Sequence, residues 1–403
     1  MKRIKVAMVD DKSPYSKSLL EGYEKAGIDR LELAFFSPKV VSSRKRRLRC
    51  SFPNEKMVWT SNLYPFQIFR QVMRDRPDLV HVQYEFATFG SFLSSFLFPV
   101  LLMLLKMAGS KIATTIHSVI PRESVDAAFV QKSLPMRALG GFKGIEQFFR
   151  IILLILYESI VILSDAIIVH GKWYKRKLVE SYGAIPCKIW VVPYGVDDTQ
   201  NLDIKSLNLW KEHIAQRNVI LFFGHVSPRK DIETLIKAFA LFSKKDPRYL
   251  LLIAGRSPPY YAGYMNRLKS MVNQLDLSDR VVFTGYLTDE EIHVLYALSE
   301  FVVFPYVYAF EGPSGPLAFA IQHHVPVIGY GVGNLQQEIV DMKEGLLVPP
   351  MNTSALEEAM TALANNNALR MKFAENIGAK MPTRLWKEIA RKTFQVYEEL
   401  LAR

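Results

Sequence analysis

The stretch Asn218–Ser243, NVILFFGHVSPRKDIETLIKAFALFS, contains in one run the elements that decide the fold. Its first residues are continuously apolar and end at Gly224, which is typical of a strand buried on both faces. Apolar residues then recur at helical spacing from Ile232, and another apolar run follows at Tyr249–Gly255. A buried strand, a helix and a second buried strand predict a βαβ unit in a parallel sheet.

The rest of the chain repeats this alternation. After the opening stretch, further strands are predicted at Val281–Gly285, Phe301–Pro305 and Val325–Gly329. Helical patterns accompany them over 260–275, 289–299 and 314–323. The first half has six apolar runs of strand length, at Ile4–Val9, Leu31–Phe36, Leu79–Gln83, Lys111–His117, Ala166–His170 and Ile189–Val192. Helices are expected between them, over 18–26, 65–74, 91–107, 148–163 and 174–182.

These patterns predict an α/β protein of two Rossmann-like, doubly wound domains. A chain of 403 residues suits two such domains, and we expect them at 1–197 and 198–382. An amphipathic helix over 383–403 completes the chain, and it either packs on its own domain or crosses back to the first. In such sheets ligands bind beyond the carboxyl ends of the strands. We therefore expect a binding cleft between the domains.

Composition restricts the class of protein. Hydrophobic residues make up 49% and charged residues 22%, as in a folded globular chain. The two cysteines, Cys50 and Cys187, lie far apart and have no metal-ligand spacing, which indicates a reducing compartment and no zinc site. The N-terminus runs directly into a predicted strand, so no signal peptide is expected. We expect a cytoplasmic protein with no nucleic-acid partner, no metal and no cofactor.

The formal net charge of +12 lies entirely in residues 1–197. Much of it is concentrated in a basic cluster, Arg44, Lys45, Arg46, Arg47 and Arg49, which would attract phosphates or anionic lipid head groups, or would form a solvated loop. Two apolar segments, Ser91–Leu105 and Phe148–Leu163, fall short of the roughly 20 residues of a spanning helix. They are either buried helices or helices in the inner membrane interface.

Two loops of the second half have the chemistry of an anion site. The first, Gly224–Lys230, joins a strand to a helix and carries the basic pair Arg229 and Lys230. A glycine lets the backbone approach a ligand, and the helix N-terminus favours negative charge. The second, Phe310–Leu317, is rich in Pro and Gly and contains Glu311, whose carboxylate could accept hydrogen bonds from sugar hydroxyls.

Six ordered motifs resemble the GT-B glycosyltransferases, in particular the retaining enzymes of family 4. Val192–Asp197 (VPYGVD) resembles I-P-N-G-V-D, and Gly224–Lys230 resembles G-R-L-x-x-x-K-G. The strand ends at Gly255 and Gly285 match the next two motifs. Glu311–Ile328 resembles E-G-F-G-L-P-L-L-E-A-M-A-x-G-x-P-V-I, and 345–350 reads GLLVPP as the family does. The resemblance covers about half of the chain.

The resemblance implies roles for individual residues. In the donor site, Lys230 would hold the diphosphate, Gly224 and Gly255 would let it lie close, and Glu311 would bind the transferred sugar. The remaining donor-side positions are His225, Arg229, Ser314, Gly315, Pro316, Leu317 and Phe319. Phe319 stands where the family has a second Glu that holds the ribose, and His225 where it has Arg. Phe319 cannot accept hydrogen bonds but could pack against ribose or base.

The first domain would supply further site residues. Thr115-Ile116-His117 resembles the family's strand that ends in a His beside the reacting carbon, so His117 is predicted at the catalytic site with Lys230 and Glu311. His81–Phe86 (HVQYEF) with Phe89-Gly90 resembles H-I-Q-H-E-x-G-I-F-G. This places Glu85 on the acceptor side. Lys12 and Ser13 follow the first strand, where the family's Gly-Gly is replaced, and are assigned to the same side.

The predicted reaction transfers a hexose of mannose or glucose type from a nucleotide diphosphate sugar to an acceptor hydroxyl, with retention and without a metal. Three hypotheses stay open. The acceptor is lipid-linked, membrane-proximal or a glycan, which the basic and apolar first domain favours; or it is a soluble small molecule; or the chain is a non-catalytic sugar- or nucleotide-binding relative, as Phe319 suggests.

Overall fold

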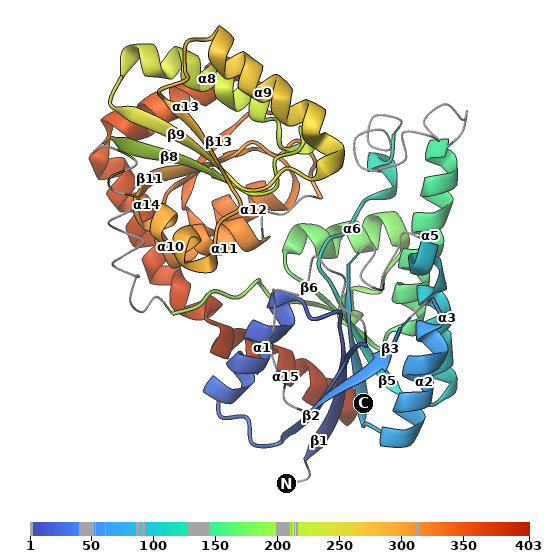
Figure 1. Cartoon of the computed structure of the whole chain (residues 1–403). Helices are drawn as coiled ribbons and strands as arrows, with labels where there is room; N and C mark the ends of the chain where they lie inside the picture. The colour runs from blue at the N-terminus through green and yellow to red at the C-terminus, as the bar shows by residue number, and fades with distance from the viewer. Residues whose placement is uncertain are drawn as a thin grey trace. The chain divides into compact units, whose positions relative to one another are not determined.

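The computed structural model describes residues 3–39, 52, 54–60, 62–85, 89, 93–126, 145–198, 210, 212, 214, 217–310 and 314–403. These residues divide into two compact units. Among them, unit 1 comprises residues 3–195 together with Arg384–Arg403, and unit 2 comprises Val196–Thr383. Each unit is a parallel sheet with helices on both faces (Figure 1). The prediction of two Rossmann-like α/β domains is therefore confirmed.

The sheet of unit 1 has the strand order β3-β2-β1-β4-β5-β6-β7, and all its pairings are parallel. Its strands are β1 (Ile4–Val9), β2 (Leu31–Pro38), β3 (Glu55–Trp59), β4 (Leu79–Tyr84), β5 (Lys111–Ile116), β6 (Ala166–Val169) and β7 (Ile189–Val191). The central strand β4 is buried along its whole length. The chain moves outward from β1 in both directions, so the order reverses between β1 and β4.

Helices cover both faces of this sheet. α2 (Tyr64–Asp75), α3 (Phe98–Met107), α5 (Ile145–Leu163) and α6 (Lys172–Tyr182) follow one another as crossovers from β3 to β7. Right-handed crossovers in one direction place them on one face, and α2, α3 and α5 are neighbours there (Figure 1). α1 (Pro14–Lys25) connects β1 to β2 and therefore lies on the other face.

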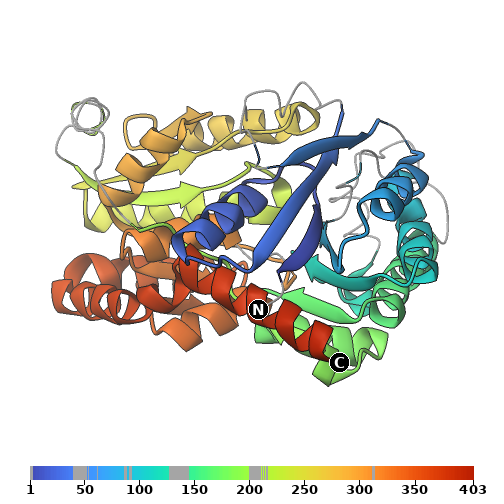
Figure 2. The ribbon, with the colours of Figure 1, turned by 90° about the horizontal axis from the view of Figure 1, so that it is seen from below.

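The C-terminal helix α15 (Trp386–Ala402) completes the second face of unit 1. It packs beside α1, and the two helices lie together in both views (Figures 1 and 2). Its apolar side, with Ile389, Val396, Tyr397 and Leu400, belongs to the same core as β1 and β4. Burial of that side is what holds a helix with a polar outer face in place.

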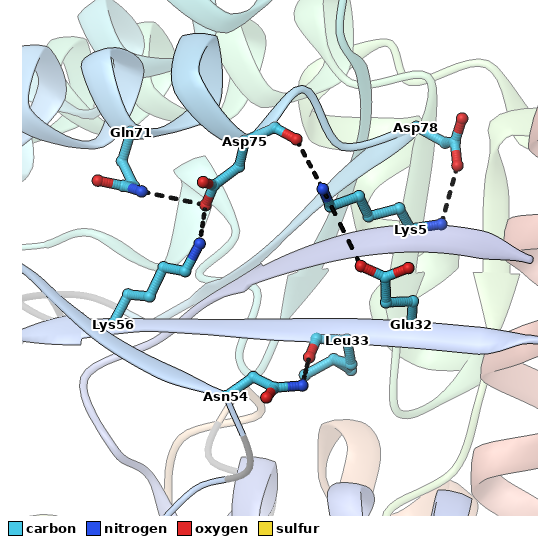
Figure 3. A network of polar contacts seen from close by, with 8 residues as sticks. All are labelled: Lys5, Glu32, Leu33, Asn54, Lys56, Gln71, Asp75 and Asp78. Carbon is cyan, nitrogen blue, oxygen red and sulfur yellow. Dashed lines mark hydrogen bonds and ion pairs between the residues drawn. The ribbon is translucent and has the colours of Figure 1, made fainter.

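Strand β3 was not predicted, and a network of polar contacts explains how it is held (Figure 3). Lys56 of β3 donates to Asp75 Oδ2 at 2.7 Å, and Gln71 donates to the same oxygen at 3.1 Å. The Asp75 carbonyl accepts from Lys5 Nζ of β1 at 2.9 Å. Burial raises the pKa of Asp75, but the hydrogen bonds from Lys56 and Gln71 outweigh it and the pKa is lowered. Charged contacts thus fix this edge strand.

The sheet of unit 2 has the order β10-β9-β8-β11-β12-β13, again with parallel pairings throughout. Its strands are β8 (Asn218–Phe223), β9 (Tyr249–Ala254), β10 (Val281–Gly285), β11 (Ser299–Phe304), β12 (Val327–Tyr330) and β13 (Gly345–Val348). The strand order reverses between β8 and β11. Loops that leave β8 and β11 turn to opposite faces there, which opens a crevice at the carboxyl edge.

Two groups of helices enclose this second sheet. α8 (Ile232–Lys245), α9 (Ala262–Gln274) and α13 (Thr353–Asn365) cover one face, and α13 packs on α8. α10 (Asp289–Ala297), α11 (Ser314–Gln322) and α12 (Gly333–Met342) cover the other. α14 (Asn367–Lys380) contacts α12 and α13 and precedes α15.

Three details differ from the sequence-based expectations. The first helix begins at Pro14 and not at residue 18, because Ser13 caps it by accepting a hydrogen bond from the Ser16 N–H at 3.2 Å. The helix expected over 91–107 is divided into a 3-10 segment, Leu93–Leu97, and α3, which carries Pro99 in its first turn. The helices α12, α13 and α14 and the strand β13 had not been predicted.

Candidate functional site

The carboxyl edge of β8, β9 and β10 in unit 2 is formed by three glycines. Gly224, Gly255 and Gly285 follow or end these strands and have φ values of 149°, 133° and 72°. Gly224 N–H donates to Ala254 O at 3.0 Å, and Gly255 N–H donates to Gly285 O at 3.1 Å. A Cβ on Gly255 would collide with the Gly224 carbonyl. The three strand ends therefore present bare backbone where a ligand would approach.

Lys230 lies next to this edge, at the crevice between β8 and β11. It ends a short 3-10 turn, Pro228–Lys230, before α8, and its Nζ lies 3.3 Å from the ring centroid of Tyr306. Tyr306 is buried and its hydroxyl donates to Phe223 O at 3.4 Å. The cation–π contact directs the ammonium group across the crevice, from the β8 loop to the β11 loop. His225 is exposed and Arg229 is half-buried.

Asp231 holds the β8 loop in place. Its backbone is left-handed, with φ 43°, and its carboxylate accepts from Tyr330 Oη at 2.6 Å and from Thr234 Oγ1 at 2.9 Å. Tyr330 ends β12, so the turn that carries Lys230 is fixed to a strand at some distance in sequence. A rigid cation at a strand edge is preorganised for an anion and needs little rearrangement to bind one.

The loop Phe310–Leu317 is described at its ends. Phe310 is buried and stacks on Tyr308 at 5.4 Å between ring centroids. α11 begins at Ser314, Leu317 is buried, and Tyr296 Oη donates to Pro316 O at 2.7 Å. A Cβ on Gly315 would meet no atom of the described part of the chain within 4 Å. Glu311 lies outside the described residues.

Phe319 packs into a cluster of rings beside this loop. Its ring lies 5.6 Å from Tyr296, 5.8 Å from Phe223 and 5.1 Å from His293, between centroids. His293 Nδ1 is 2.9 Å from Nε2 of His323, one turn after Phe319. Burial, with smaller contributions from the neighbouring His293 and His324, lowers the pKa of His323 to about 4. The position is therefore aromatic and half-buried.

The start of α12 also lies at the carboxyl edge of the unit 2 sheet, which the sequence did not lead us to expect. Gly333 has φ 55°, and a Cβ there would collide with the Ala309 carbonyl. Asn334 N–H donates to Ala309 O at 3.1 Å. Gly333 and the polar Asn334 after β12 are the sequence feature from which this part of the edge could have been predicted. Their contacts with Ala309 bring the loop after β12 against the loop after β11.

The corresponding edge of unit 1 lies between β1 and β4. Asp10 Oδ2 accepts from Ser13 N–H at 2.8 Å and from Ser13 Oγ at 2.6 Å. Lys12 has φ 68° and pairs with Glu55 Oε1 at 2.6 Å. Glu85 follows β4 and is exposed. Lys12, Ser13 and Glu85 are thus at the carboxyl edge where the strand order reverses.

His117 follows β5 at the same edge and is held by two side chains. Its Nε2 lies 3.1 Å from the Gln83 amide, and its Nδ1 lies 3.0 Å from Nε2 of His170, which follows β6. The Tyr15 ring lies 4.8 Å from the His117 ring, edge to face. Burial lowers the pKa of His117 to about 4, with a smaller contribution from His81. The imidazole is neutral at pH 7.

An exposed apolar face covers the outer side of α2, α3 and α5. Its members on α5 recur at helical spacing, and the opposite side of that helix is buried in unit 1. The face consists of Phe66, Met73, Met103, Met107, Phe148, Ile151, Ile155 and Ile162. Exposed basic residues accompany it at Arg70, Arg74, Arg76 and Lys106. The predicted buried helices are therefore buried on one side only.

The described residues include neither a membrane-spanning helix nor a cluster of metal ligands. None of their helices is long and apolar enough to cross a membrane. No group of three or more His, Cys, Asp or Glu side chains among them is placed to hold a metal ion. The basic cluster Arg44, Lys45, Arg46, Arg47 and Arg49 lies outside the described part of the chain.

Comparison with known proteins matches both units. Residues 207–380 match the family described as "Glycosyl transferases group 1", and residues 15–200 match "Glycosyltransferase Family 4". D-inositol 3-phosphate glycosyltransferase of Kineococcus radiotolerans is 24% identical over 60% of this chain and 58% of its own length. O-antigen chain mannosyltransferase C of Escherichia coli is 30% identical over 47% of this chain and 48% of its own.

A solved structure is similar over the whole length. Anabaena Alr3699/HepE in complex with UDP has a TM-score of 0.72 and 14% identity, covering 99% of this chain and 100% of that one. The chain spans between about a third and three fifths of the length of the curated relatives it matches. The two family matches lie one in each half of a two-domain Rossmann-like fold. The chain belongs to the GT-B glycosyltransferases of family 4.

Proposed function

We propose that this chain is a retaining hexosyltransferase that uses a nucleotide diphosphate sugar. It transfers a hexose of mannose or glucose type to a hydroxyl of a lipid-linked or glycan acceptor. The observation that carries the proposal is the bare glycine edge of unit 2 with Lys230 fixed beside it. Support also comes from HepE, which was crystallised with UDP, and from a mannosyltransferase among the relatives.

The proposed chemistry places negative charge on the leaving diphosphate. In an oxocarbenium-like transition state the bond from the anomeric carbon to the diphosphate oxygen breaks while the acceptor oxygen bonds to the same face of that carbon, and the acceptor hydroxyl gives its proton to the leaving diphosphate oxygen. Lys230 and Arg229 would stabilise the charge that grows on the diphosphate, together with the N–H groups of the Ser314–Gly315 turn. Glu311 would position the sugar, and His117 would contact it beside the reacting carbon. No metal takes part in this scheme, so EDTA should leave the rate unchanged.

A turnover assay against a panel of GDP, UDP and ADP sugars tests this proposal. Release of nucleoside diphosphate that depends on an acceptor is expected with one donor and is expected to fall in Lys230→Ala. His117→Ala should lower it as well. If no donor is turned over but one raises the melting temperature by mass action, the chain is a non-catalytic binding relative. Such a relative is the second candidate, and the aromatic Phe319 in place of a carboxylate favours it.

We further propose that the acceptor is presented at an anionic membrane. The apolar face of α2, α3 and α5 has the mixed apolar and basic character of a surface that lies in a lipid interface. The alternative, a soluble small-molecule acceptor, would leave this face without a partner. The exposed basic side chains Arg70, Arg74 and Arg76 complement anionic head groups, whereas Lys106 is paired with Asp165 at 2.6 Å.

Sedimentation with anionic vesicles at low and high salt decides between the two acceptors. The protein should pellet with the vesicles at low salt and less at high salt. Ile155→Glu should reduce pelleting, because it places a charge on the apolar face. Met371→Glu is the matched control, since Met371 of α14 is 55% exposed and Ile155 is 54% exposed. Absence of binding by the unmodified protein at low salt would contradict membrane presentation.

A further inference from the structure

A chain of hydrogen-bonded side chains leads from the C-terminal helix to His117. Tyr23 Oη of α1 donates to Tyr397 Oη of α15 at 3.0 Å, and Tyr397 Oη lies 2.6 Å from His81 Nδ1. His81 Nε2 lies 2.7 Å from Thr115 Oγ1 and 3.3 Å from the Gln83 amide. These groups are buried, so each of their polar atoms needs its partner.

The chain continues through His117 to a backbone carbonyl. The Gln83 amide lies 3.1 Å from His117 Nε2, and His117 Nδ1 lies 3.0 Å from His170 Nε2. At the far end, His170 Nδ1 is 3.0 Å from Val192 O, just after β7. The strands β4, β5, β6 and β7 are successive neighbours in the sheet. Their carboxyl ends therefore bring these residues into one line.

The histidines of this chain are neutral. Burial lowers the pKa of His81 to about 3 and that of His170 to about 3, and the pKa of His117 to about 4. The groups in contact with the His170 ring, in the described part of the chain, are His117, Tyr15, Tyr194 and the Val192 carbonyl. None of these carries a negative charge at neutral pH that would stabilise a buried imidazolium.

Neutrality fixes where each proton sits. Val192 O can only accept, so His170 Nδ1 carries the proton and donates it. A neutral imidazole has one N–H, so His170 Nε2 is a bare acceptor. His117 Nδ1 must then donate to it, which leaves His117 Nε2 without a proton. The backbone of β7 thus determines the tautomer of a side chain after β5.

Gln83 must match this tautomer. If the Gln83 amide oxygen faced His117 Nε2, two hydrogen-bond acceptors would face each other. A half-turn of the amide exchanges its oxygen and nitrogen at nearly the same positions. The nitrogen then donates to His117, and the His81 Nε2–H faces both Thr115 Oγ1 at 2.7 Å and the Gln83 oxygen at 3.3 Å. His81 Nδ1 becomes the acceptor of the Tyr397 hydroxyl. The donors from Tyr23 to Val192 O then all point in one direction.

We propose that His170 is a positioning residue that holds His117 as the Nδ1–H tautomer, with Gln83 oriented by Tyr397 and His81 to occupy the free Nε2. This deepens the proposed transferase function and rests on it for its catalytic meaning. A sugar hydroxyl that reaches His117 would donate to Nε2 and take the place of the Gln83 amide. His117 therefore serves as a hydrogen-bond acceptor.

Nitrogen-15 NMR of the histidine rings tests the proposal without any substrate. The full chain has eight histidines, so the spectrum is sparse, and the His117→Gln variant identifies the signals of His117. In the unmodified protein, Nδ1 of His117 should be of the pyrrole type and Nε2 of the pyridine type. In His170→Phe, Nδ1 loses its acceptor, and the two nitrogen types should exchange.

Two further variants separate this effect from general damage. His170→Gln keeps an acceptor for His117 and a donor for Val192, so the unmodified pattern should be kept. Tyr397→Phe should change the nitrogen signals of His81 but not those of His117, because Val192 still sets the tautomer. Tyr64→Phe is the matched control: it removes another buried hydroxyl of unit 1, which donates to Ser94 O at 3.1 Å, and should change neither.

Kinetics add a second readout. His170→Phe should lower kcat/KM about tenfold, as expected for one lost hydrogen bond to substrate, and His170→Gln should restore most of it. A pyrrole-type Nε2 on His117 in the unmodified protein overturns the proposal, as does an unchanged pattern in His170→Phe. If the pattern is as expected but no nucleotide sugar is turned over, the tautomer assignment stands and the proposed function is the one that fails.

Discussion

The loops after β1 in unit 1 and after β8 in unit 2 occupy the same point in two sheets of the same winding, yet they are built in opposite ways. After β8, Gly224 and Gly255 present bare backbone, and Lys230 lies across a ring beside it. After β1, Asp10 accepts two hydrogen bonds from Ser13, and Lys12 is paired with Glu55. One loop is open to a ligand, and the other is filled by its own polar contacts.

Strand order alone therefore does not make an anion site. Both sheets reverse their order at this point, and both loops carry a lysine. In unit 1 the lysine is neutralised by a carboxylate of the same unit. In unit 2, Lys230 contacts the face of Tyr306, which orients its ammonium group at the glycine edge. The bare backbone of that edge is why we propose that the diphosphate binds to unit 2.

The largest effect is expected at Lys230. Lys230→Ala should lower kcat/KM for the donor about 10²–10³-fold, because it removes a preorganised cation from the growing negative charge. Donor dissociation constants and steady-state rates measure this. Lys237→Ala, on the exposed side of α8, is the control and should leave both unchanged. A Lys230→Ala enzyme with unmodified kinetics would remove the basis for assigning the diphosphate to this loop.

The glycine edge is expected to matter for stability. Gly255→Ala should lower the free energy of unfolding by about 1–3 kcal/mol or more, because the backbone has φ 133° and the new Cβ meets the Gly224 carbonyl. Urea unfolding followed by circular dichroism measures it. Gly263 of α9 has open space around its Cβ position, so Gly263→Ala should be neutral or slightly stabilising. Equal stability of the two variants would show that the strand ends are not close-packed.

A smaller effect is expected in the filled loop of unit 1, and it depends on pH. Burial raises the pKa of Glu55, but hydrogen bonds from Lys12 and Ser37 outweigh it and the pKa is lowered. A carboxylate with a depressed pKa stabilises the fold above its unfolded pKa of about 4.3, and this contribution is lost as pH falls through the folded pKa.

Lys12→Met removes that pairing. The variant should be less stable than the unmodified protein at pH 7, by about 1 kcal/mol, and the gap should close as the pH is lowered to about 3. Melting temperatures across this range measure the gap. A gap that is constant with pH would mean that the Lys12–Glu55 pair contributes nothing through its charge.

Much of the fold could be predicted because buried parallel strands are continuously apolar. Nearly all the strands were recognised in this way, and the apolar runs of β8 and β9 are examples. β3 was missed because its sequence, EKMVW, begins with charged residues, and one of these, Lys56, contacts Asp75 of α2. α14 has a single buried residue, Ile377, so its sequence has no amphipathic pattern from which a helix could be predicted.

The site could be predicted only where it is local in sequence. Gly224 and Lys230 lie on one loop, and the resemblance marks both. The pairing of His117 with His170 joins residues 53 positions apart, and it depends on β5 and β6 being neighbours in the sheet. No spacing rule connects them. The role of Phe319 likewise depends on rings from β8 and α10 that meet it only in the folded unit.

The smallest effect is expected at Gly315 in the open edge of unit 2. Substitution there should change ligand binding and leave the stability of the ligand-free protein unchanged. Among the described residues, a Cβ at Gly315 meets no atom within 4 Å, and the backbone begins a helix, so Gly315→Ala should leave the melting temperature of the ligand-free protein unchanged or slightly raised. If the open space is where the phosphates lie, the methyl group should weaken binding of the nucleoside diphosphate of the donor that is turned over, several-fold or about 1 kcal/mol. Calorimetry with GDP, UDP and ADP measures the binding, and Gly263→Ala is the matched glycine substitution in the same unit. Tight binding by Gly315→Ala would mean that the α11 turn does not touch the phosphates and that the β8 loop holds them without it.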